Sequence, residues 1–199
     1  MLLGNVLDLG TPSDNTVTGA KLNNDIISAQ TELAATPADT DELLISDAGT
    51  IKRIDYSYLK QANTPAFHAQ STAGTSVSSS DTKIAFNVEI FDTAGAYDHS
   101  TNYRFTVPSG QAGKYFFYAN VRVNSATDFD NVQMMFYKNG SVFNKTNVYN
   151  TDYNTVQNST IADLSAGDYM EVYCYFATTS TIRSTQNENN FFGYKLIGA

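Results

Sequence analysis

Histidine, cysteine and carboxylate side chains are the residues of this chain that could carry out chemistry, and their spacing does not form a catalytic group. His68 and His99 are the only histidines. Neither has a second histidine at metal-binding spacing, nor a nearby nucleophile with a third group to orient it. His99 lies among turn-forming residues at 97–101, so we expect a solvated turn histidine. The sequence therefore predicts a protein that is not an enzyme.

Two groups of acidic residues could instead bind calcium, which prefers oxygen ligands supplied by loops. One contains Asp128 and Asp130, and the other contains Asp152 between Asn150 and Asn154. Neither group has the fixed spacing of a dedicated calcium loop, and Asp and Asn are also ordinary loop formers. No cofactor is therefore expected, while calcium at Asp128, Asp130 or Asp152 stays an open alternative.

Residues 144–157 are predicted to form a loop, and its composition suits recognition of a sugar or a protein. Tyrosine provides contact area at low entropic cost, and amide side chains provide adaptable hydrogen bonds. The recognition candidates are Tyr149, Asp152, Tyr153 and Asn154. The alternative is a variable surface loop that binds no ligand.

Cys174 is the only cysteine, so it cannot form a disulfide within the chain. It lies in the almost continuously apolar segment 170–176, which predicts a buried structural thiol rather than a reactive one.

The composition indicates a mainly β protein without a nucleic-acid or membrane function. The 199 residues include 13 Tyr, 12 Phe and no Trp, and aromatic residues favour strands. The formal net charge of −8 and the absence of a Lys/Arg cluster argue against nucleic-acid binding. No apolar run approaches the length needed to insert into a membrane. The first residues lack the features of a secretory signal, so we expect synthesis and assembly in a cytoplasm.

Three segments follow one another along the chain: 1–35, 36–61 and 62–199. The first contains many leucines, which suggests docking onto another protein, although a frayed tail is equally compatible. A helix is predicted over 18–34 from apolar residues at spacings of four, three and four: Leu22, Ile26, Ala29 and Leu33. Such a short helix needs a partner, which would be either two sister chains or the C-terminal domain.

The second segment is predicted to be a β-hairpin. Strands are expected at 43–46 and 51–56, joined by a turn in which Gly49 supplies a positive φ. Ile51 and Ile54 do not alternate strictly, so we expect the second strand to bend or bulge. A lone two-stranded hairpin is barely stable, which calls for association between chains.

The third segment contains strands at a regular spacing, with turns at Asn139-Gly140 and at 166–168, and this pattern is typical of a β-sandwich or jelly roll. The expected strands are 67–70, 82–86, 103–107, 113–123, 132–138, 141–143, 159–164, 169–177 and 191–197. Residues 71–80 are expected to form a loop.

The segment from Pro65 to Ala199 also resembles the C1q-like domain family. The resemblance rests on motifs spread in order along it: Pro65-Ala66-Phe67, Phe105-Thr106-Val107-Pro108, Gly113-Lys114-Tyr115-Phe116-Phe117, Tyr137-Lys138-Asn139-Gly140 and Phe191-Phe192-Gly193-Tyr194-Lys195-Leu196. It implies a ten-stranded jelly roll that assembles as a compact homotrimer and binds ligands without catalysis.

Trimer formation would explain why two strands are apolar on both faces. One face of 113–123 and of 169–177 can fill the sandwich, and the other needs different cover. From the resemblance, which implies aromatic residues near a threefold axis, we take Tyr115, Phe117, Tyr173 and Tyr175 as candidates for the trimer interface.

Residues 36–60 resemble a short module found in bacteriophage tail-fibre and other virion proteins. Together the two resemblances imply a virion structural protein: a trimeric short tail fibre or host-recognition fibre, whose head binds a host surface glycan or protein and whose N-terminal region docks on other virion proteins. The alternative is a capsid decoration or head-fibre protein with a structural or adhesive role.

Overall fold

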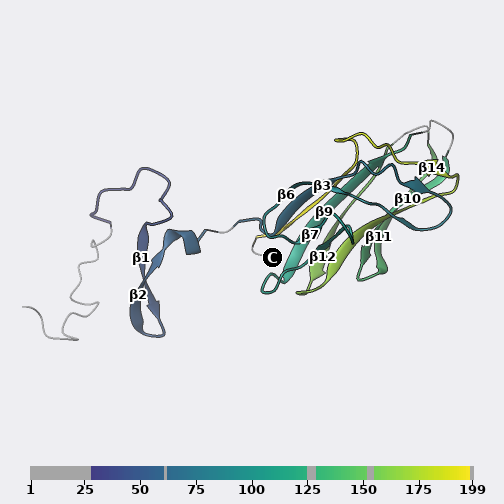
Figure 1. Ribbon diagram of the computed structural model, residues 1–199. Coiled ribbons are helices and arrows are strands. Elements are labelled where there is room, and N and C mark those ends of the chain that lie inside the picture. The colour runs from purple at the N-terminus through teal and green to yellow at the C-terminus, as the bar shows by residue number, and fades with distance from the viewer. Residues whose placement is uncertain (1–27, 61, 125–128, 152–154, 198–199) are drawn as a thin grey trace, which may run out of the picture. The chain divides into compact units, whose positions relative to one another are not determined.

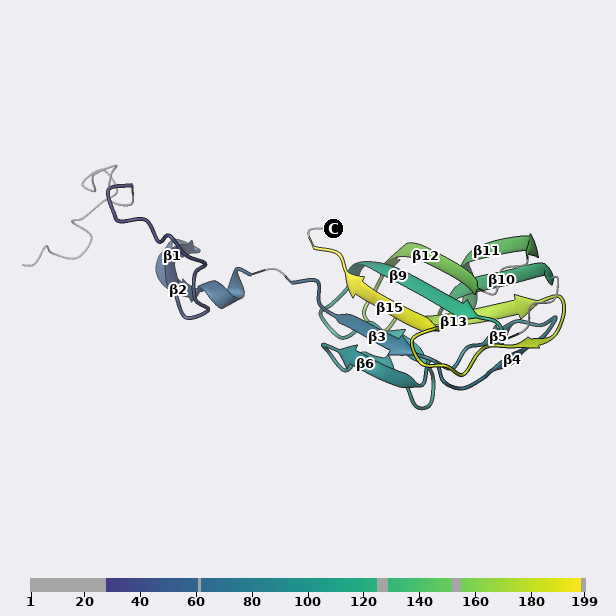
Figure 2. The same cartoon turned by 90° about the horizontal axis from the view of Figure 1, so that it is seen from above.

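The computed structural model describes residues 28–60, 62–124, 129–151 and 155–197 (Figures 1 and 2). The chain divides into two compact units, at the boundary between Lys60 and Gln61. We call them the hairpin unit and the head and consider each by itself. Within the described ranges, no helix is long and apolar enough to cross a membrane.

The hairpin unit contains strands β1 (Glu42–Asp47) and β2 (Thr50–Asp55), followed by a short 3-10 helix at Tyr56–Tyr58. The two strands pair in a continuous antiparallel register from Glu42↔Asp55 to Asp47↔Thr50. Ala48 and Gly49 both have positive φ, at 48° and 86°, as a tight two-residue hairpin turn requires. The predicted hairpin is thus confirmed.

Two local predictions for this unit were wrong. The second strand has no bulge: Ile51 and Ile54 lie on opposite faces of a regular strand, whose register stays continuous. Residues 28–34 form a turn and irregular backbone rather than the end of a helix, which is consistent with the marginal stability of one short amphipathic helix. The rest of the predicted helix lies outside the described residues.

The head is a sandwich of two antiparallel sheets. The five-stranded sheet has the order β12 (Thr155–Leu164), β9 (Gly113–Arg122), β15 (Asn190–Lys195), β3 (Ala66–Gln70) and β6 (Val88–Asp92). The six-stranded sheet has the order β11 (Ser141–Thr151), β10 (Phe129–Lys138), β13 (Tyr169–Phe176), β8 (Arg104–Thr106) and β7 (Tyr97–Asp98), with β5 (Thr82–Lys83) also pairing with β13. Two short strands, β4 (Ser76–Val77) and β14 (Ser180–Thr181), pair separately. The predicted jelly-roll sandwich is confirmed, although the two sheets hold more than ten strands.

Aromatic rings from both sheets fill the space between the layers. Phe67 stacks on Tyr97 and Phe105, with ring centroids 4.8 and 5.1 Å apart, and meets Phe191 edge-on at 4.9 Å. Cys174 is fully buried in the same core, which confirms the structural thiol. Because the core is built from alternate residues, the other residues of each strand must face outward.

The structure also corrects the predicted loops. Residues 144–157 were predicted to be a loop, but most of them belong to strands β11 and β12. Each of these is the outermost strand of its sheet, where polar Asn and Thr side chains can face water. Residues 71–80 contain the short strand β4. The Asn139-Gly140 turn is confirmed, with φ of 52° and 78° and Lys138 paired with Ser141.

Candidate functional site

The outward face of the five-stranded sheet carries a row of aromatic side chains. From β9 come Phe116 and Tyr118, and from β15 come Phe192 and Tyr194. β3 and β6 add His68 and Phe91. We call this set the aromatic face: His68, Phe91, Phe116, Tyr118, Phe192 and Tyr194.

Strand register explains why these rings line up. Phe192 lies opposite Tyr118 on one side and His68 on the other, and Tyr194 lies opposite Phe116. Tyr118 and Phe192 stack at 5.0 Å, and Phe116 and Tyr194 are 5.4 Å apart. Cross-strand aromatic pairs of this kind stabilise the sheet, and they leave the four rings half-buried.

His68 lies within this face rather than in a catalytic group. Its ring meets Phe192 edge-on at 5.8 Å and Phe91 at 6.1 Å, and Nε2 is hydrogen-bonded to Asn190 Oδ1 at 3.0 Å. His99 is exposed and its Nδ1 lies 3.2 Å from Glu89 Oε2, so it has a carboxylate partner that the sequence did not reveal.

An apolar groove of about 280 Å³ runs along the aromatic face, lined by Ala66, Phe67, His68, Phe91, Phe192, Gly193 and Tyr194. This groove combines aromatic and aliphatic lining with an open mouth on the sheet surface, so it is a candidate for an interaction surface.

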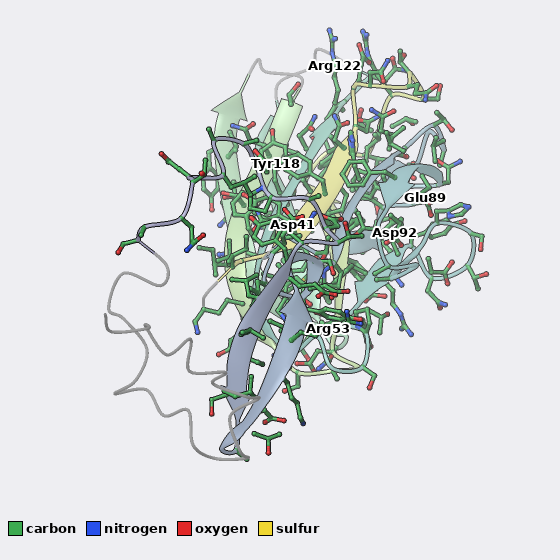
Figure 3. All side chains as sticks on the ribbon, turned by 90° about the vertical axis from the view of Figure 1, so that its left-hand side faces the viewer. Asp41, Arg53, Glu89, Asp92, Tyr118 and Arg122 are labelled. Atoms are coloured by element: carbon green, nitrogen blue, oxygen red, sulfur yellow. The ribbon has the colours of Figure 1, made fainter. Side chains whose placement is uncertain are left out.

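The same sheet face becomes polar toward the far end of β9. Asn190 Oδ1 accepts a hydrogen bond from Gln70 Nε2 at 3.0 Å, and Asn190 Nδ2 donates to Asn120 Oδ1 at 3.1 Å. Arg122, labelled with Tyr118 in Figure 3, ends this row and pairs with Glu188 at 2.7 Å. The aromatic face therefore has one polar boundary built from amides and an ion pair.

A second polar boundary lies at the β12 edge of the sheet. Tyr118 donates its hydroxyl hydrogen bond to Gln157 Oε1 at 2.8 Å. Beside it is a hollow of about 380 Å³, lined by Tyr118, Asn144, Lys145, Thr146, Gln157, Asn158 and Ser159. The aromatic face is thus framed by polar groups on two sides, as protein interfaces commonly are.

Two of the four residues predicted for the trimer interface do not lie on a surface. Tyr115 and Phe117 are 0% exposed and belong to the core. They alternate along β9 with Phe116 and Tyr118. The predicted strand was therefore right, but Phe116 and Tyr118 face outward where Tyr115 and Phe117 were expected to. Gly193 shows what fixes this choice: a Cβ atom there would lie 2.5 Å from Phe117 Cδ1, so the glycine makes room for the inward ring.

Tyr173 and Tyr175 are half-buried on the outward face of the other sheet, so they cannot join the same surface as β9. Tyr173 stacks on Tyr137 with centroids 4.0 Å apart, and Lys83 Nζ lies 5.8 Å from its ring centre. Lys83 also pairs with the buried Glu171 at 2.5 Å. Burial, and a hydrogen bond that its hydroxyl donates to Asp81, raise the pKa of Tyr137 to about 12.

Of the recognition candidates, Tyr149 alone can be placed with its side chain. It lies on the edge strand β11 opposite Asn131 and is 62% exposed. Asp152, Tyr153 and Asn154 lie outside the described residues, so the candidates are not shown together.

The calcium candidates are likewise only partly described. Asp128 and Asp152 lie outside the described residues, and Asp130 is placed only by its backbone in β10. Among the side chains that the structure does describe, no three His, Cys, Asp or Glu groups converge as metal ligands would.

Comparison with known proteins shows the fold. No protein-family model matches the sequence, and no curated protein sequence is significantly similar to it. Similar solved structures include murine APRIL at pH 5.0, with a TM-score of 0.52, 13% identity and coverage of 66% of this chain and 98% of that one. They also include the globular domain of the zebrafish complement 1qA protein, with a TM-score of 0.51, 14% identity and coverage of 67% and 98%. The head of this chain has the C1q/TNF-type jelly-roll fold.

Proposed function

We propose that this protein is a homotrimeric bacteriophage virion protein, a short tail fibre or host-recognition fibre that binds through its head. The observation that carries the trimer is the aromatic face: six ring-bearing residues and an apolar groove on one surface of the head, where Phe91 is exposed and the other rings are half-buried. A head that associates through this face removes that surface from water.

Self-association suits this face better than a small-molecule ligand does. The rings stack on one another along the sheet, so they form a broad surface rather than a deep enclosed pocket. The amides and the Arg122–Glu188 pair beside it provide a polar border of the kind found around interface cores. The trimeric state agrees with the resemblance of residues 65–199 to C1q-like domains.

The virion assignment rests on residues 36–60, which resemble a module of phage tail-fibre proteins and fold as a hairpin. Three heads on one fibre, and several fibres on one particle, would multiply weak binding to a host glycan or protein. Tyr149, exposed on β11, is the described residue best placed to contact such a receptor. We expect binding without catalysis.

The second candidate function is capsid decoration. It differs in where the N-terminal region docks, which would be on the capsid shell rather than on the tail.

Two measurements test the proposal. Light scattering after size-exclusion chromatography should give the mass of three chains for the purified protein at micromolar concentration, and the mass of one chain would refute the trimer. Virions labelled with gold-conjugated antibody against the head should carry grains at the tail, and the purified head should then block adsorption. Grains over the capsid would select the decoration role, and unlabelled particles would refute the virion assignment.

A further inference from the structure

The polar hollow beside Tyr118, of about 380 Å³, lies where the outermost strands of the two sheets meet. β11 ends the six-stranded sheet and β12 ends the five-stranded sheet, and the two strands are neighbours at one side of the sandwich (Figure 2). We call it the seam hollow. It shares no lining residue with the apolar groove, so a trimer contact that closes the groove can leave the seam hollow open.

Hydrogen-bonding side chains line the seam hollow. Three of them are amides and two are hydroxyls: Asn144, Gln157, Asn158, Thr146 and Ser159. Asn158 is only 7% exposed, and its Nδ2 donates to the Met134 carbonyl oxygen at 3.1 Å, so it forms a fixed part of the wall. Amides and hydroxyls both donate and accept. Several of them around one hollow suit a ligand that carries several hydroxyl groups, as a sugar does.

Asn144 supplies the observation that points to a ligand. Its Oδ1 is buried and has no hydrogen-bond partner among the described groups. An unpaired buried acceptor is costly, and most buried polar atoms of folded proteins are paired. A ligand hydroxyl that donates to Asn144 Oδ1 would supply the missing hydrogen bond.

Lys145 determines the charge that the ligand should carry. Among the described residues that line the seam hollow, only Lys145 is charged, and its side chain is exposed. The ion pairs of the described residues all involve other groups. An ammonium group forms a charge-assisted hydrogen bond with a carboxylate, so an acidic ligand is favoured over a neutral one.

Tyr118, labelled in Figure 3, adds an apolar surface to this polar lining. Its ring is held by stacking on Phe192 and by the hydrogen bond from its hydroxyl to Gln157. A tyrosine that is already held in place offers contact area at little entropic cost. The C–H groups of a sugar ring can use such a surface while the hydroxyl groups bond to the amides.

We propose that the seam hollow binds a sugar unit that carries a carboxylate, as part of a polysaccharide on the host surface. Lys145 pairs with the carboxylate, Asn144 Oδ1 accepts a hydrogen bond from a hydroxyl, and Tyr118 contacts the ring. The volume is near the lower end of the range for small-molecule sites, about 300–1,000 Å³, so the hollow holds a short part of the polysaccharide. The inference rests on the proposed host-binding role and names the ligand class.

Saturation-transfer NMR on the full-length protein tests this site. The probes are the methyl glycosides of glucuronic, galacturonic and N-acetylneuraminic acid, with methyl glucoside and methyl galactoside as neutral counterparts. We expect an acidic glycoside to bind and the neutral ones to bind more weakly. Lys145→Gln should weaken the acidic glycoside about fivefold, the upper end for an exposed ion pair. The matched control Lys114→Gln changes an exposed lysine that does not line the hollow, and should bind as wild type does.

A second variant separates binding from folding. Asn144→Leu keeps the approximate shape of the side chain and removes its polar atoms. Because Asn144 Oδ1 has no partner to lose within the described ranges, the melting temperature should not fall, whereas binding of the acidic glycoside should weaken severalfold. A lower melting temperature with unchanged binding would show that Asn144 serves the fold and not a ligand.

The remaining outcomes distinguish this inference from the proposed function. No binding of any acidic glycoside, or equal binding by wild type and Lys145→Gln, would overturn the inference. A Lys145→Gln protein that is no longer trimeric by light scattering would assign the hollow to the contact between copies and would also overturn it. Equal block of adsorption by wild type and Lys145→Gln would keep the host-recognition role and place the receptor contact elsewhere. The trimer and virion assignments are tested by mass and gold labelling, which do not involve the sugar.

Discussion

Phe192 lies at the centre of the aromatic face, and its removal should weaken the trimer more than any other single truncation there. Its ring stacks on Tyr118 at 5.0 Å and meets His68 at 5.8 Å, and it lines the apolar groove. In the Phe192→Ala variant the sheet keeps its backbone register, because this side chain faces away from the core. The change should therefore act on association and leave the fold of the head intact.

The size of the effect follows from the three equivalent contacts. Truncating a central aromatic interface residue costs about 2 kcal/mol or more, so a trimer that loses three rings loses about 6 kcal/mol. At about 1.4 kcal/mol for each factor of ten, the trimer dissociation constant should rise roughly 10⁴-fold. The dissociation constant of a trimer has units of concentration squared, so the protein concentration at which half of the trimer dissociates varies with its square root. That concentration should therefore rise roughly 100-fold.

Sedimentation velocity over a dilution series measures this concentration. The matched control is Phe143→Ala, which removes an exposed phenylalanine on β11, outside the aromatic face. We expect wild type and control to stay trimeric at concentrations where the Phe192→Ala protein is largely monomeric. Equal dilution curves for Phe192→Ala and Phe143→Ala would refute the argument that this sheet face is the trimer contact.

Three further outcomes follow from the head. Gly193→Ala would place a Cβ 2.5 Å from Phe117 Cδ1 and 2.8 Å from the Phe116 carbonyl oxygen. The free energy of unfolding should therefore fall by about 1–3 kcal/mol, and the melting temperature should fall by several degrees. An unchanged melting temperature would contradict this packing. Hydrogen bonds from Asn139 and the Ser165 amide, with Lys138 nearby, lower the pKa of Asp168 to about 2. The deprotonated carboxylate therefore stabilises the head above about pH 4, and this contribution is lost as the pH falls through about 2. In urea titrations, the difference in unfolding free energy between wild type and Asp168→Asn should shrink as the pH falls through that window. A difference that does not change with pH would show that the ionised carboxylate does not stabilise the head. Burial raises the pKa of the Cys174 thiol well above its usual value, so a thiol reagent at pH 8 should react only at the rate of unfolding, and fast labelling of folded protein would exclude a buried site.

Much of the fold could be predicted because its signals are local. The Asn139-Gly140 pair adopts the positive φ values that a tight hairpin needs, and the apolar strands around it form where expected. The hairpin at 42–55 formed for the same reason, with Gly49 in its turn. These signals depend on a few neighbouring residues, which a sequence displays directly.

The facing of β9 could not be predicted, because residues 114–121 are apolar on both sides. What decides it is distant in the chain: Gly193 pairs with Phe117 across β15 and β9 and makes room for that ring. The edge strands were missed for a related reason. Residues 144–157 are rich in Asn and Thr, and their strand structure follows from pairing of β11 with β10 and of β12 with β9.

The two outward sheet faces have similar aromatic content, yet their interactions differ. On the six-stranded sheet Tyr173 already has a stacked ring at 4.0 Å and a lysine cation that is itself paired with a buried glutamate. The tyrosine rings there stack on each other, and the lysine contacts both a ring and a glutamate. Covering that face with a partner would therefore add little binding free energy. On the five-stranded sheet the rings touch only along the sheet and border an apolar groove. Burying this groove would remove apolar surface from water, so association should proceed through the five-stranded sheet.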